Sequence, residues 1–93
     1  MISVRDAAKN ALNFYKDIYP EISGELIEEV EFDSTRQYWL ITLSFPMKVD
    51  NSQSPLSNIL QPKFERKYKT FEVDAKNGEV VSMKIRLLEN ERN

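Results

Sequence analysis

Apolar residues recur at helical spacing near the start of the chain and at alternating positions along most of the rest. Ser3 is a favourable N-cap residue, and Asp6 follows it at the spacing of a capping box. Pro20 disfavours helical geometry at the preceding residue, so the helix is predicted to end near Tyr19. The apolar positions, three or four residues apart, form one stripe: Val4, Ala7, Ala8, Ala11, Leu12, Tyr15, Ile18 and Tyr19.

Two strands are predicted after this helix, over residues 25–33 and 38–45. In the second strand, apolar and aromatic residues alternate with the residues of the other face, as expected of a strand with one buried face. A four-residue loop at 34–37 would place the apolar side chains of both strands on that face. The expected cross-strand pairs are Phe32 with Trp39, Val30 with Ile41, and Leu26 with Phe45.

The last third of the chain, residues 68–85, predicts a β-hairpin. A two-residue turn at 77–78 would mix apolar and polar side chains on one face, whereas a three-residue loop at 76–78 keeps the apolar set together. Gly78 would then take the left-handed conformation that closes such a loop. The favoured register pairs Val73 with Val81 and Phe71 with Met83.

These elements predict an α+β fold, with one N-terminal amphipathic helix packed on a four-stranded antiparallel meander sheet. A sheet with one apolar face needs a cover, and the helix supplies one. Trp39, Phe71 and Val81 are expected under the helix. A chain of 93 residues is too short to divide its apolar residues between two cores, so we expect one domain over 1–93.

The segment 46–63 is longer than an ordinary hairpin connection, and such segments are usually functional or disordered. Ser54 followed by Pro55 favours a helix start, and Pro62 a stop. We expect an inserted loop or a short helix here. Three of its side chains share one helical face and are candidate partner contacts: Leu56, Ile59 and Leu60.

Composition narrows the classes of function. The chain has no His and no Cys, which excludes Ser-His-Asp and Cys-His nucleophilic sites, disulfides and the usual zinc ligands. We therefore expect no metal and no cofactor. A net charge of −2 argues against general nucleic-acid binding. The sequence shows neither a signal peptide nor an apolar run long enough to span a membrane, and we expect a cytoplasmic protein.

The order of elements and several local motifs resemble a PepSY domain, a family with a cystatin-like α+β shape. The shared features are a Ser-capped Ala-rich helix (3–11), an acidic strand (28–31), an aromatic pair at 38–39 and a closing Val-Asp-Ala-x-x-Gly-Glu-Val motif at 73–80. The resemblance covers most of residues 3–87 but not the segment 46–63. It implies a non-catalytic module that binds or restrains a protein partner, and it brings no catalytic residues.

Residues 21–33 contain six carboxylates and no Lys or Arg, which allows three interpretations. One is a cation site, although carboxylates that alternate along a strand point to opposite faces. Another is a charged edge strand that resists edge-to-edge aggregation, which we favour. The third is an enzyme that uses Glu29, Glu31 and Asp33 in acid-base chemistry.

A basic run follows the long segment, and it suggests either an anionic partner or a solvated strand start. We favour the solvated strand. Lys67 and Lys69 share the phase of the apolar Phe71 and Val73, so either a bulge intervenes or the core face is uncovered at that end. The run consists of Lys63, Arg66, Lys67 and Lys69.

Tyr38, Leu40 and Tyr68 fall in the phase opposite to the core, on a sheet face with no predicted cover. They complete the set of candidate partner-binding residues, with incidental exposure of scattered apolar side chains as the alternative, and the expected partner is a protein. The alternative is a weak homodimer through this open face or through the last strand, predicted over residues 80–88, because an unpaired strand edge invites pairing.

Overall fold

The computed structural model describes residues 1–48 and 64–87 and contains one helix and four strands over these ranges. The helix α1 spans Val4–Ile18, and the strands are β1 (Leu26–Asp33), β2 (Tyr38–Lys48), β3 (Phe64–Asp74) and β4 (Val80–Arg86). The strands form one antiparallel sheet in the order β1-β2-β3-β4. The predicted α+β fold, a helix on a four-stranded meander, is thus confirmed.

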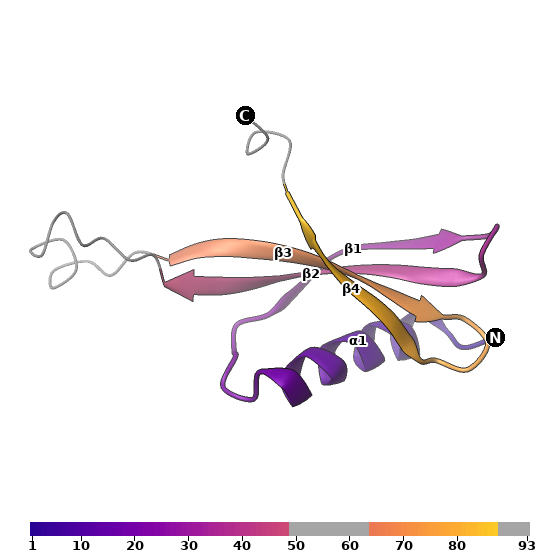
Figure 1. Cartoon of the computed structure of the whole chain (residues 1–93), viewed down its shortest axis with the longest axis horizontal. Coiled ribbons are helices and arrows are strands. Elements are labelled where there is room, and N and C mark those ends of the chain that lie inside the picture. Colours follow the sequence, from indigo (N-terminus) through magenta and orange to yellow (C-terminus); the bar gives the residue numbers. More distant parts are fainter. Residues whose placement is uncertain (49–63, 88–93) are drawn as a thin grey trace, which may run out of the picture.

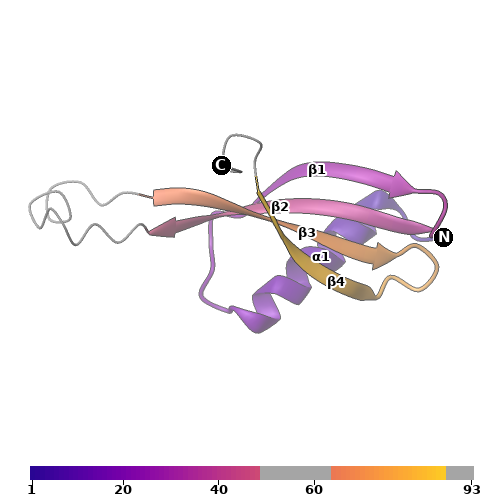
Figure 2. The ribbon, with the colours of Figure 1, turned by 45° about the horizontal axis from the view of Figure 1, so that its top comes forward.

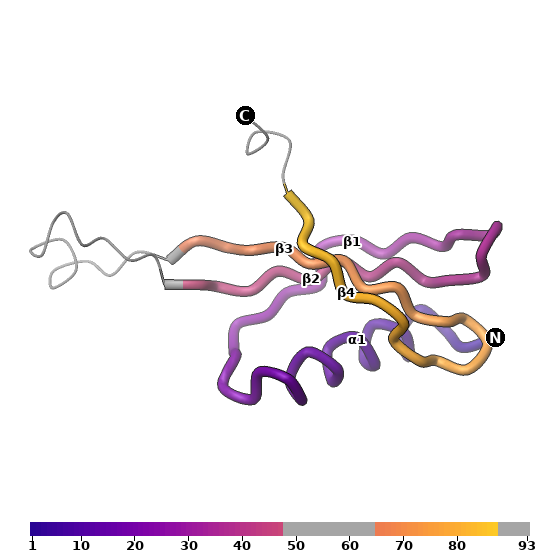
Figure 3. Tube along the Cα trace, viewed as in Figure 1, coloured from indigo at the N-terminus to yellow at the C-terminus, as the bar shows by residue number. Residues whose placement is uncertain are grey.

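The helix covers one face of the sheet and leaves the other without a cover among the described residues (Figure 1). Figure 2 shows the meander in order, with α1 crossing behind it. The sheet is strongly twisted: β4 starts beside the helix, and its far end rises to the opposite side of the sheet (Figures 1 and 3). We call the uncovered side the open face.

The core lies between α1 and the central strands. Ser3 caps the helix as predicted, since its side chain accepts a hydrogen bond from the Asp6 N–H at 3.1 Å. Small residues allow a close approach to the sheet, and Tyr15 stacks on Phe45 with ring centroids 3.8 Å apart. Burial raises the pKa of the Tyr15 phenol. The buried cluster contains Ala7, Ala8, Ala11, Tyr15, Ile41, Leu43, Phe45, Phe71 and Val73.

The chain start and the helix are fastened to the β3–β4 turn. The Ile2 N–H donates to the Ala75 carbonyl at 2.7 Å, and Trp39 Nε1 donates to the Ile2 carbonyl at 3.1 Å. Asn10 Nδ2 of the helix donates to the Gly78 carbonyl at 2.9 Å. Gly78 takes a φ of 79°, as predicted, and a Cβ there would lie 2.8 Å from Asn10 Nδ2. Glycine therefore allows both the turn and the close approach of the helix.

The register of β1 on β2 is predicted correctly for the second half of β1 only. Phe32 faces Trp39 and Val30 faces Ile41, but Leu26 faces Ser44 rather than Phe45. A bulge between Ile27 and Glu29 shifts the pairing by one residue. Leu26 consequently leaves the core side and is 53% exposed.

The β3–β4 hairpin differs from the prediction at two compensating points. The loop has four residues, because the Gly78 N–H donates to the Asp74 carbonyl and the Asp74 N–H donates to the Glu79 carbonyl, both at 2.8 Å. Val73 therefore faces Val80, and a bulge then restores the predicted pairing of Phe71 with Met83. Val81, expected under the helix, is 47% exposed, so that prediction is wrong.

The long connection begins later than predicted, because β2 continues through Pro46 and Met47 to Lys48. Residues 49–63 lie outside the described residues, and the expectations for Leu56, Ile59 and Leu60 fall among them. The pairing of β2 with β3 has no bulge, so Lys67 and Lys69 do lie on the core side. Figure 1 shows β2 and β3 running past the end of α1, which leaves that part of the core side uncovered by the helix.

Candidate functional site

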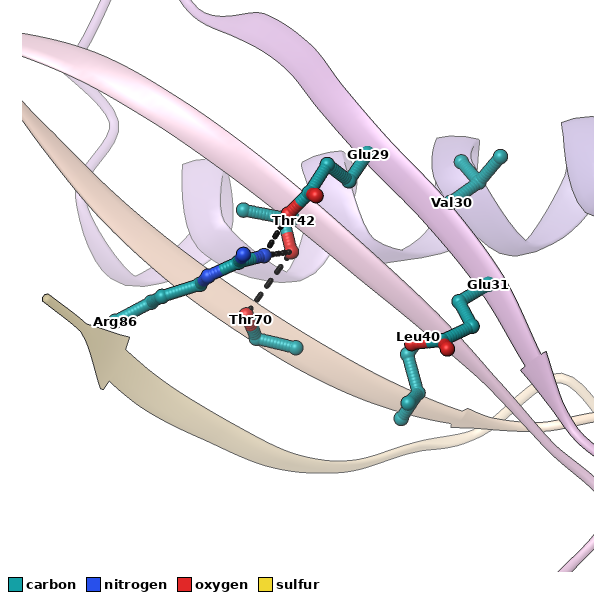
Figure 4. A pocket seen from close by; sticks show the side chains of 7 residues that line it. All are labelled: Glu29, Val30, Glu31, Leu40, Thr42, Thr70 and Arg86. Carbon is teal, nitrogen blue, oxygen red and sulfur yellow. Dashed lines mark hydrogen bonds and ion pairs between the residues drawn. The ribbon is translucent and has the colours of Figure 1, made fainter. Parts of the chain in front are cut away.

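The open face carries a shallow depression of about 470 Å³ between the two outer strands. Figure 4 shows Arg86 stretched over the two central strands toward Glu29, while Val30 points away from the group. Glu31 and Leu40 lie together farther along β1 and β2. The lining residues are Glu29, Val30, Glu31, Leu40, Thr42, Thr70 and Arg86.

An ion pair joins the outer strands across this depression. The Arg86 guanidinium on β4 pairs with the Glu29 carboxylate on β1. Arg86 Nη1 also donates to Thr42 Oγ1 at 3.3 Å, and the Thr42 and Thr70 hydroxyls are hydrogen-bonded at 3.0 Å. Three strand spacings separate β1 from β4, about 14 Å in a flat sheet, so both long side chains must lie across the face. We call this arrangement the Arg86–Glu29 bridge.

A second polar group connects β3 and β2 to the segment before β1. Arg66 on β3 donates through Nε to Ser44 Oγ at 2.8 Å and through Nη2 to the Gly24 carbonyl at 2.7 Å. Ser44 Oγ in turn donates to Glu28 Oε2 at 2.6 Å. Ser44 is fully buried, so this hydroxyl requires the partners it has. Arg66, predicted as part of a basic run, therefore has a structural role in joining β3 to the chain before β1.

A third group surrounds Glu72, whose side chain is only 11% exposed. Ser82 Oγ donates to Glu72 Oε1 at 2.6 Å, and Arg36 Nη2 lies 2.6 Å from Glu72 Oε2. Lys84 Nζ is 3.8 Å away. The hydrogen bond from Ser82, followed by the contact with Arg36, outweighs desolvation and lowers the Glu72 pKa below 4.5.

The three described candidates for partner binding lie on the open face as predicted, but not as one patch. Tyr38 and Leu40 lie on β2, and the Arg36 guanidinium is 5.2 Å from the centre of the Tyr38 ring. Tyr68 lines an adjoining depression, which shares Glu29, Thr42 and Arg86 with the first. The Arg86–Glu29 bridge and the two threonines lie between these ends, so the face presents two small apolar areas.

The carboxylates proposed for acid-base chemistry have different surroundings. Glu29 is in the bridge, while Glu31 lines the depression. Asp33 accepts from Arg36 Nε at 2.8 Å, and this bond, with those from backbone amides, lowers the Asp33 pKa below 3.8. A general acid near neutral pH needs a raised pKa, so the direction at Asp33 gives no support to that role.

The prediction that neighbouring carboxylates on β1 point to opposite faces is wrong at the bulge. Glu28 contacts Ser44, and Glu29 contacts Arg86, so both carboxylates lie on the open face. Within residues 1–48 and 64–87, no three His, Cys, Asp or Glu side chains are close enough to hold a metal ion. β1 is nevertheless an outer strand of the described sheet, as the charged-edge interpretation requires.

Sequence reasoning missed the Arg86–Glu29 bridge and the pairing of Thr42 with Thr70. The predicted strand phases did place Thr42 and Arg86 on the open face, so their side of the sheet was accessible to prediction. Whether their side chains meet depends on their separation across the sheet, which is set by the twist of the sheet and by side-chain conformation. No local motif in the sequence encodes that distance.

A scan against protein-family models and searches of curated proteins and of solved structures found no match for this chain. The helix of the described residues, α1, is not long and apolar enough to cross a membrane.

Proposed function

We propose that this chain is a non-catalytic binding module, similar in kind to PepSY domains, that contacts a protein partner through its open face. The observation that carries the proposal is the depression lined by Leu40, on the face of the sheet opposite the covering helix. Tyr38, two residues before Leu40 on β2, adds an aromatic ring on the same face of the sheet. Leu40 and Tyr38 thus present an aliphatic and an aromatic side chain beside polar and charged groups, and such anchors are typical of protein interfaces.

The charged groups of this face support binding over acid-base catalysis. The carboxylates of Glu28, Glu29 and Glu72 each contact an Arg or hydroxyl group that holds them in place. Such fixed pairs can position a partner and set its register without changing protonation state. The segment 46–63, with Leu56, Ile59 and Leu60, is part of the same proposal as a second contact region.

The proposal predicts position-specific cross-linking to a partner. A photo-reactive phenylalanine analogue at position 40 should give a discrete cross-linked band in lysate, because this position lies in the depression. The matched control carries the analogue at Lys9, which is exposed on the helix side. If both positions gave the same cross-linked products, or if neither gave any, the result would contradict a partner on the open face. A chain lacking residues 50–60 tests whether the segment contributes to the same band.

A further inference from the structure

Both outer strands of the described sheet end in a regular stretch of five residues with an unpaired outer edge. On β1 this stretch is 29–33, beyond the bulge, and on β4 it is 82–86, also beyond a bulge. Bulges are one way in which proteins protect sheet edges from pairing. Here both bulges lie outside the regular stretches and leave them able to pair.

The two edges have opposite charges and matching apolar positions. On the open-face side, β1 presents Glu29 and Glu31, whereas β4 presents Lys84 and Arg86. On the helix side, Val30 on β1 is 49% exposed and Ile85 on β4 is 74% exposed. On the open-face side, the carboxylates of β1 therefore complement the cations of β4. On the helix side, each edge offers an exposed apolar residue to the other.

We propose that β1 of one copy pairs with β4 of a second copy as antiparallel neighbours, continuing the sheet from molecule to molecule. In one register all five positions match in character. The residues opposite one another are Glu29 and Arg86, Val30 and Ile85, Glu31 and Lys84, Phe32 and Met83, and Asp33 and Ser82. Because Glu29 and Arg86 already pair within each copy, the charge pair between copies is Glu31 with Lys84. This proposal goes beyond the proposed function, since it uses the edges of the sheet and needs no other partner.

Hydrogen-bond geometry allows the same register. In antiparallel ladders, residues alternate between those whose amide and carbonyl point to one neighbour and those that point to the other. The pairs Glu29–Thr42, Thr42–Thr70 and Thr70–Lys84 follow one another across the sheet without a bulge. Glu29 and Lys84 therefore direct their backbone groups either both inward or both outward. The register that pairs Glu31 with Lys84 consequently joins outward groups to outward groups.

Charge favours this head-to-tail contact over a symmetric one. Pairing β1 with β1 would bring carboxylates together, and pairing β4 with β4 would bring cations together, whereas opposite charges across a strand pair are stabilising. The Lys84 side chain is 70% exposed, and its contact with Glu72 is long, at 3.8 Å. Each contact leaves one β1 and one β4 edge for the next copy, so the assembly is an open chain or a ring.

Charge reversal at one pair tests this proposal. For the full chain, the sedimentation coefficient at low salt should rise with concentration. Glu31→Lys and Lys84→Glu should each shift this rise to about tenfold higher concentration, because each places like charges opposite one another. An equimolar mixture of the two variants should recover wild-type association, because every contact between unlike variants again joins opposite charges. The double variant should also recover it.

Two exposed positions away from the edges serve as controls. Lys9→Glu on the helix and Glu79→Lys beside the β3–β4 turn make the same changes of charge and should leave association unchanged. The proposal is overturned if wild type stays at 10.9 kDa at every concentration. It is equally overturned if the mixture associates no better than either variant alone. Circular dichroism of each variant separates loss of association from loss of fold.

Discussion

Phe71→Ala is expected to lower the free energy of unfolding by about 3–5 kcal/mol. Phe71 is fully buried, and its ring meets Phe14 and Tyr15 edge-on, with centroids 6.3 and 6.1 Å away. The substitution would leave a cavity at the centre of the contact between helix and sheet. A 93-residue domain has a total stability of roughly 5–14 kcal/mol, so this loss is a large share of it.

Urea denaturation, monitored by circular dichroism, measures the change. The matched control is Val81→Ala on the next strand. The structure places Val81 in a bulge and 47% exposed, so its truncation should cost only about 0.5 kcal/mol. A large loss at Val81 would mean that the hairpin has the register without the bulge, whereas a small loss at Phe71 would contradict its place in the core.

Glu72→Gln is expected to destabilise the fold at neutral pH by about 1.5–3 kcal/mol, the range for hydrogen bonds to charged groups. The side chain is mostly buried and bonds to Ser82 on β4 and to Arg36 in the β1–β2 loop. It thus connects β3 to the outer strand β4 and to the loop between β1 and β2. The amide keeps the shape of the side chain but removes the charge that Arg36 and Lys84 contact.

The same carboxylate predicts how stability depends on pH. Its pKa is lowered in the folded state, so its contribution is present above the ordinary value of 4.5 and is lost as pH falls through the folded-state pKa. Asp33 and Glu25, whose pKa values are also lowered, act in the same direction. Denaturation between pH 3 and 7 should therefore show a smaller acid loss in Glu72→Gln than in wild type. Parallel pH curves for the two proteins would contradict the assignment.

Alternation of apolar and polar residues predicts the helix, the four strands and the side of the sheet on which each central residue lies. This works because one buried face imposes a strict period of two on β2 and β3. The predictions failed at Leu26 and Val81, where a bulge inserts one residue. Each bulge lies in an outer strand of the described sheet. There an apolar residue can become exposed with little loss of stability, so the alternation of apolar and polar residues constrains the register weakly.

The open face was harder to predict than the core. Periodicity places Tyr38, Leu40 and Tyr68 on it, but their separation into two areas results from the Arg86–Glu29 bridge between them. That bridge depends on the twist of the sheet and on the reach of two long side chains. Similarly, Arg66 appears in the sequence as one of several cations, whereas its partners are Ser44 and Gly24, about twenty or more positions away.

The central claim is that α1 covers one face of the sheet and that the face around Leu40 is accessible. Methyl relaxation in the full chain, with a soluble paramagnetic chelate and at a concentration below any self-association, tests it most directly. Strong relaxation is predicted for the Leu40 methyl groups and for Ile85, and little for Ile41 and Leu43, which are fully buried. Leu40 methyl groups as protected as those of Ile41 would contradict the account, because another part of the chain would then cover the open face.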